Sequence, residues 1–157
     1  FTGIFVIMGA IGFARFGYTL ILPRMSAALE MSETGAGGVA TANLIGYLLF
    51  SLLGGVLATR FSPRIVITIS LGLTGIALVC SGLAGSLLSA TLWRFLAGAG
   101  GAANVPMVGL ISSWFTSKRR GLAQGIIVSG SSFSLLLTGL VLPQVMAADD
   151  ATGWKHA

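Results

Sequence analysis

Long apolar runs separated by short polar junctions make up most of this chain. Five of these runs are long enough to cross a bilayer, since a membrane-spanning helix needs about 20 predominantly apolar residues. They cover residues 3 to 23, 36 to 59, 64 to 84, 88 to 115 and 121 to 145. The pattern predicts an all-α membrane protein with five transmembrane helices. The third run, which carries nothing more polar than Thr, Ser and Cys, is predicted to face lipid.

The junctions between the runs carry charges whose sign alternates along the chain. Arg60 and Arg64 occupy one junction and Lys118, Arg119 and Arg120 another, whereas acids lie at the remaining junctions, namely Glu30, Glu33, Asp149 and Asp150. Basic loops stay in the cytoplasm during insertion. The loops near residues 60 and 118 are therefore predicted to be cytoplasmic and those near residues 30 and 150 external. Because the connections are short, consecutive helices are also expected to be antiparallel neighbours.

The composition supports membrane insertion and argues against several other classes of protein. Hydrophobic residues make up 55% of the chain and charged residues only 8%, with a mean hydropathy of +0.95, whereas soluble proteins average about 25% charged residues. The net charge of +5 lies at predicted membrane edges, so nucleic-acid binding is not expected. Cys80 is the single cysteine and predicts neither a disulfide nor a metal site. No nucleophile with a base and no paired carboxylates are visible, so neither an enzyme nor a cofactor is predicted.

Three stretches resemble motifs of a known transporter family. The segment from Gly55 to Arg64 is similar to the loop between helices two and three of the major facilitator superfamily, although Thr59 and Ser62 replace the usual acid and glycine. The fourth run contains an arginine followed by glycines, Arg94, Gly98, Gly100 and Gly101, which resembles the fourth-helix motif of that superfamily. The following loop, with Lys118, Arg119, Arg120 and Gly121, is similar as well.

The resemblance covers nearly the whole chain and implies most of a six-helix, amino-terminal bundle. The chain begins at Phe1 without a methionine and ends where a sixth span could start, so it is expected to be a fragment whose partner is the missing C-terminal half. Arg15, Phe16, Gly17, Tyr18 and Pro23 are further similar to a bacterial YbfB-like branch, which implies a multi-pass protein of the bacterial inner membrane.

Arg15 is the foremost candidate for a functional residue, because an arginine at the centre of a span costs roughly 2.5 to 3.5 kcal/mol on insertion scales and normally faces a cavity or a partner. A structural role paired with backbone carbonyls is the alternative. Tyr18, three residues on, is expected to share the face of Arg15, and Asn43 and Asn104 are expected to border the same solute cavity. Arg94 and Gly98 are assigned coupling or structural roles, with the Arg94 side chain able to reach outward past Trp93.

The predicted cytoplasmic gate consists of Gly55, Arg60, Arg64, Lys118, Arg119 and Arg120. None of the five runs contains Asp or Glu, so a proton carrier is expected elsewhere in the full protein. An arginine without an acidic partner favours an anionic solute. The predicted function is secondary active transport of a small, anionic organic solute across the lipid bilayer by alternating access. A non-transporting membrane scaffold or sensor is the alternative.

Overall fold

The computed structural model describes residues 2–28 and 30–147, and this part of the chain contains helices and no strand. Five helical segments are long and apolar enough to cross a membrane, namely Gly3–Ala27, Glu33–Arg60, Pro63–Gly82, Leu87–Trp114 and Ser117–Gln144. The chain is therefore an all-α membrane protein, as its hydropathy predicts. Asp149 and Asp150, on which part of the predicted orientation depends, lie outside the described residues.

The first span combines three helical elements, α1 (Thr2–Ile7), the π-helix η1 (Met8–Gly17) and α2 (Tyr18–Ala28). A π-helix bonds each N–H to the carbonyl five residues back, so residues three or four apart no longer align as they do in an α-helix. The span also continues past Pro23, where the sequence predicts its end. Proline is tolerated there because other groups in a membrane helix bundle can satisfy the freed backbone carbonyl.

The second and third spans are unbroken helices with well-defined starts. The first of them, α3 (Glu33–Arg60), begins at Ser32, whose hydroxyl accepts a hydrogen bond from the Gly35 N–H at 3.1 Å. Its acid at position 33 and its base at position 60 suit the helix dipole at the two ends. The next helix, α4 (Pro63–Gly82), begins with proline in the first turn, where the missing N–H costs no hydrogen bond.

The fourth span is interrupted, giving α5 (Leu87–Gly101) and α6 (Asn104–Trp114). The N–H groups of Ala102 and Ala103 each donate to the carbonyl three residues back, at 3.2 Å in both cases. Pro106 explains the position of the break, because its ring would clash with the carbonyl of Ala102, four residues earlier, in a continuous α-helix. The break thus lies one turn before the proline.

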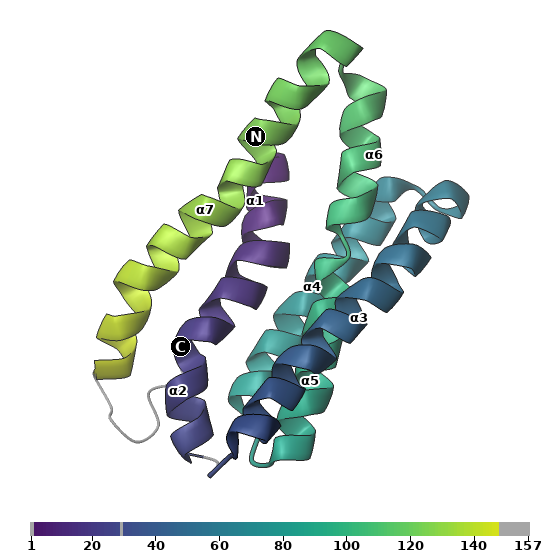
Figure 1. Ribbon diagram of the computed structural model, residues 1–157. Helices are drawn as coiled ribbons and strands as arrows, with labels where there is room; N and C mark the ends of the chain where they lie inside the picture. The colour runs from purple at the N-terminus through teal and green to yellow at the C-terminus, as the bar shows by residue number, and fades with distance from the viewer. Residues whose placement is uncertain (1, 29, 148–157) are drawn as a thin grey trace.

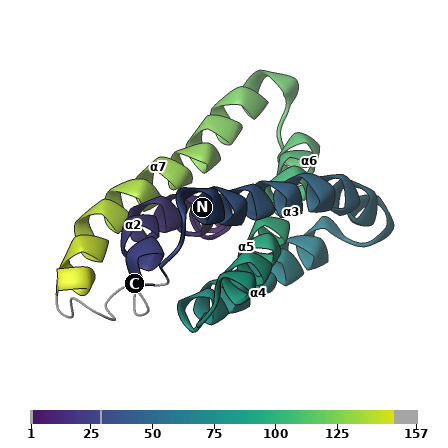
Figure 2. The ribbon, with the colours of Figure 1, turned by 60° about the horizontal axis from the view of Figure 1, so that its bottom comes forward.

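Helix α5 is the centre of one group of helices, since both α3 and α4 pack mainly against it (Figure 1). The fifth span, α7 (Ser117–Ala147), packs instead along α1 and η1 and meets α6 only at the end where the two are joined (Figure 2). Consecutive helices do contact each other in these two pairs, but they are not each other's main neighbours. Helices α3 and α4 touch each other little, and α7 packs chiefly on the first span rather than the fourth.

The lipid-facing character of the third span stays a prediction. In its most apolar stretch 28% of residues are buried, against 11% in α3 and 22% in α7. Thr74, Ala77 and Ser81 of α4 are buried because α4 packs against α5. Within the described residues, the least covered helix is α3.

Candidate functional site

Arg94 of α5 is a buried cation that holds the fourth span against the first. Its side chain is only 4% exposed, and Nη1 donates a hydrogen bond to the carbonyl oxygen of Ala14 at 3.2 Å. The guanidinium carbon lies 4.0 Å from the centre of the Tyr18 ring, which is a cation–π contact. Such contacts contribute about 2 kcal/mol or more when desolvated. The expectation that this side chain could reach outward past Trp93 is therefore wrong.

Asn43 of α3 contacts the same part of α5 through its side-chain amide. Its Nδ2 donates to the carbonyl oxygen of Arg94 at 2.9 Å. One helical turn further along α5, Gly98 lies against the backbone of Asn43, and a Cβ added at Gly98 would come within 3.1 Å of the Asn43 Cα. The structure thus brings together three residues that the sequence singled out separately, and joins α3, α5 and the first span through them.

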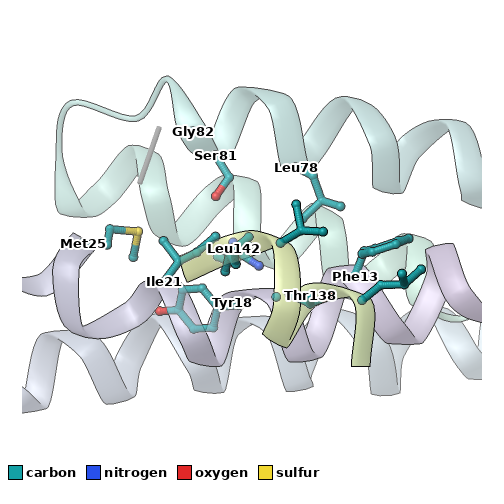
Figure 3. Close-up of a pocket in the computed structure, with 13 residues that line it drawn as sticks. Phe13, Tyr18, Ile21, Met25, Leu78, Ser81, Gly82, Thr138 and Leu142 are labelled. Carbon is teal, nitrogen blue, oxygen red and sulfur yellow. The ribbon is translucent and has the colours of Figure 1, made fainter. Parts of the chain in front are cut away.

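A cavity of about 370 Å³ lies beside Arg94, between the first span, α4 and α7 (Figure 3). Tyr18, Ile21 and Met25 line it from α2, and Leu78 and Ser81 line it from α4. Among the described residues, neither the Tyr18 hydroxyl nor the Arg94 Nε has a hydrogen-bond partner. A second cavity, of about 500 Å³, lies toward the other end of the same three spans and is bordered by α6 as well.

Arg15 lies on a different side of the first span from Tyr18, facing α3 and α5. It borders a small pocket of about 50 Å³ together with Asn43 and Tyr47 of α3. The side chain is exposed, and its guanidinium makes no hydrogen bond or ion pair with any residue that the structure describes. The predicted shared face of Arg15 and Tyr18 is therefore not found. The π-helical turn around Arg15 changes the angle between the two side chains.

The two predicted asparagines thus have different surroundings. Asn43 borders the pocket of Arg15, whereas Asn104 is half-buried at the first turn of α6 and lines neither that pocket nor the cavity beside Arg94. Tyr47 is a lining residue that the sequence analysis missed. Its spacing could have revealed it, since it follows Asn43 by four residues and so shares a helix face with it.

The two basic clusters meet at one end of the bundle. The Arg64 guanidinium carbon lies 5.5 Å from the centre of the Trp114 ring, so the start of α4 contacts the end of α6. Arg120 donates from Nε to the carbonyl oxygen of Phe115 at 3.0 Å and so satisfies a carbonyl beyond the C-terminus of α6. The remaining predicted gate cations, Arg60, Lys118 and Arg119, are exposed at the same helix ends, and Gly55 lies one turn inside α3, near Val105.

Comparison with known proteins identifies the family. The sequence pattern of the Major Facilitator Superfamily matches residues 4–157, which is nearly the whole chain. The chain belongs to this superfamily. In the fourth-helix motif of the superfamily, Arg94 is followed by three glycines. Each of these glycines lets a different helix approach the backbone of α5 closely. Gly98 meets α3, Gly100 meets Ser70 and Thr74 of α4, and Gly101 meets Ala10 of the first span.

Several transporters of this superfamily are similar to the chain. "Probable sulfoacetate transporter SauU" of Cupriavidus necator is 30% identical over 144 residues, which is 91% of this chain and 33% of the relative. "Monocarboxylate transporter 11" of Mus musculus is 34% identical over 88% of the chain and 30% of the relative. "Probable nitrate/nitrite antiporter NarK1" of Thermus thermophilus is 27% identical over 79% of the chain and 28% of the relative.

The chain thus spans about a third of the length of these relatives. All three are named as transporters or antiporters rather than as enzymes, in agreement with the sequence analysis. The narrower resemblance to the YbfB-like branch stays a prediction. Among the described residues, no group of three or more His, Cys, Asp or Glu side chains could hold a metal ion.

Proposed function

We propose that the full-length protein is a secondary active transporter of a small organic anion and that this chain supplies one face of its solute pathway. The observation that carries this proposal is the exposed guanidinium of Arg15, which lies within a membrane span and has no partner among the described residues. A permanent charge at this depth needs a cavity or a counter-ion. The names of the three relatives support an anion, since they specify sulfoacetate, a monocarboxylate and nitrate or nitrite.

In this proposal Arg15 binds two oxygen atoms of a carboxylate or sulfonate through its planar guanidinium. Asn43 borders the same pocket, but its Nδ2 is already committed to the Arg94 carbonyl. It therefore forms part of the pocket wall, and Arg15 is the residue that interacts with the charge of the anion. Arg94 is buried and bonded to Ala14, so it positions helices and does not compete for solute.

Coupling to a proton would need a titratable group elsewhere in the full-length protein. The five membrane spans hold a single acid, Glu33, at the very start of α3. Arginine stays charged at any physiological pH, so neither Arg15 nor Arg94 can carry the proton.

The rest of the protein would complete the fold around these helices. The cavities of about 370 and 500 Å³ are both lined by the first span, α4 and α7. The sixth helix that the resemblance implies would pack against these three spans and fill both cavities. A second, C-terminal bundle would face Arg15, and the two halves would rock around the solute. The basic cluster around Arg64 and Arg120 would form part of the cytoplasmic gate of a bacterial inner-membrane protein.

Uptake by proteoliposomes tests the proposal directly. Purified full-length protein should accumulate sulfoacetate or lactate, the two organic probe anions, with saturable kinetics, and nitrate serves as an inorganic comparison. An uncharged sugar of similar size should not be taken up, because it offers no charge to Arg15. Saturable transport of the sugar alone, or no uptake of any probe, would contradict the proposed anion transport.

Orientation can be tested separately with single cysteines at Ser62, Gly85 and Ser117 in a Cys80→Ala background. All three residues are exposed in helix junctions or ends. Gly85 is preferred to its neighbour Ser86, whose hydroxyl accepts a hydrogen bond from the Ser89 N–H at the start of α5. A membrane-impermeant thiol reagent added outside intact cells should label only Gly85→Cys. Labelling of Ser62→Cys or Ser117→Cys from the same side would show that the predicted topology is inverted or wrong.

A further inference from the structure

We infer that Tyr47 is a specificity-determining residue that donates a hydrogen bond to the same anion as Arg15. This inference rests on the proposed function, and it assigns a second solute contact on another helix. Tyr47 belongs to α3, whereas Arg15 belongs to η1, and the two border one pocket. An anion held by both residues would therefore bridge the first and second spans, with its charged end in this pocket of about 50 Å³ and the rest of the molecule projecting out of it.

The aromatic ring of Tyr47 packs against α5 at Gly101. A Cβ added at Gly101 would lie 3.6 Å from Cδ2 of the ring, which is ordinary van der Waals contact. A ring packed in this way directs its hydroxyl with little loss of side-chain entropy on binding, since only two torsions need to be fixed.

The hydroxyl itself has no partner among the residues that the structure describes. The lining of the pocket is otherwise mainly small or aliphatic, so Arg15, Asn43 and Tyr47 supply its polar side chains. A phenolic O–H can donate to an anionic oxygen, whereas the Asn43 amide already donates to Arg94. The donors left for a solute are thus the Arg15 guanidinium and the Tyr47 hydroxyl.

This arrangement favours anions that present more than two acceptor oxygens. The guanidinium fork takes two oxygens, and a third oxygen of a sulfonate or a neighbouring hydroxyl can accept from Tyr47. A hydrogen bond to a charged group contributes enough to change affinity by roughly tenfold or more. Tyr47 would therefore discriminate between organic anions that Arg15 alone would bind about equally.

The test is Tyr47→Phe in the full-length protein, which keeps the ring on Gly101 and removes only the hydroxyl. With sulfoacetate as the probe, KM should rise roughly tenfold while the maximal rate changes little. Lactate and nitrate serve as comparison probes in the same assay. The matched control is Ser51→Ala on the same helix, since the Ser51 hydroxyl donates to the Leu48 carbonyl at 2.8 Å and should not affect KM.

A second measurement is the increase in Tm that each probe anion produces in purified protein, which reports binding without transport. The increase with sulfoacetate should be smaller for Tyr47→Phe than for the unaltered protein. If the unaltered protein transports a probe anion but Tyr47→Phe retains its KM and its Tm increase for every transported probe, the role of Tyr47 is overturned. If the unaltered protein neither binds nor transports any probe anion, the proposed function itself fails.

Discussion

Arg15→Leu is expected to abolish anion transport while the full-length protein still inserts and folds. The substitution removes the unpaired charge that would hold the solute, so accumulation of a probe anion should fall to the level of empty liposomes. Insertion should not suffer, because an arginine at a helix centre costs roughly 2.5 to 3.5 kcal/mol on insertion scales and leucine has no such cost. Uptake into proteoliposomes and the monodispersity of the purified protein are the two measurements.

Arg15→Lys is the matched control for this experiment. Lysine keeps the positive charge but has no planar fork for two oxygens, so KM should rise while some transport remains. Normal uptake by Arg15→Leu would refute the role of Arg15 as an anchor. A protein that aggregates after Arg15→Leu but not after Arg15→Lys would show that the charge serves the fold.

Gly98→Ala is expected to destabilise the helix bundle by up to about 2 kcal/mol. The added Cβ would meet the Asn43 backbone, at 2.8 Å from its carbonyl carbon and 3.1 Å from its Cα, and a backbone cannot rotate away as a side chain can. Replacing glycine by alanine in a helix interior gains about 1 kcal/mol of propensity. Overpacking typically costs about 1 to 3 kcal/mol and occasionally more, so the clash should outweigh this gain. The Tm of the purified protein in detergent should fall.

Gly109→Ala in α6 provides the control within the same span. No atom lies within 4 Å of a Cβ added at this position, so its Tm should stay unchanged or rise slightly. Equal Tm values for the two variants would mean that α3 and α5 separate enough to accept a methyl group at their crossing. The half-buried hydrogen bond between Asn43 and the Arg94 carbonyl could then not be a fixed part of the fold.

Much of this fold can be predicted from the sequence, because the length of an apolar run and the charges beside it act locally. The breaks at Ser62 and Pro106 follow from the chemistry of single residues in the same way. The direction of individual side chains could not be predicted. Arg15 and Tyr18 are three residues apart, yet the π-helical turn places them in different cavities, and nothing in the local sequence specifies that turn.

Arg94 illustrates a second limit. Its position beside Trp93 is compatible with a side chain that reaches the membrane surface, and only the partners on another span determine its inward direction. The Ala14 carbonyl and the Tyr18 ring lie about 80 residues away in sequence. Contacts between residues this far apart in sequence depend on how the helices pack. Helix packing depends in turn on close contacts at glycines, which a hydropathy pattern does not reveal.

The interruption between α5 and α6 gives the two halves of the fourth span different mechanical properties from those of α3. At Ala102 and Ala103 the ladder of hydrogen bonds is already broken, so α6 can change direction there without losing another one. Helix α3 runs unbroken from Glu33 to Arg60, and a comparable bend would disrupt its ladder. The flexible point of the bundle therefore lies between α5, which three glycine contacts hold against its neighbours, and α6, which carries Trp114 to its contact with Arg64.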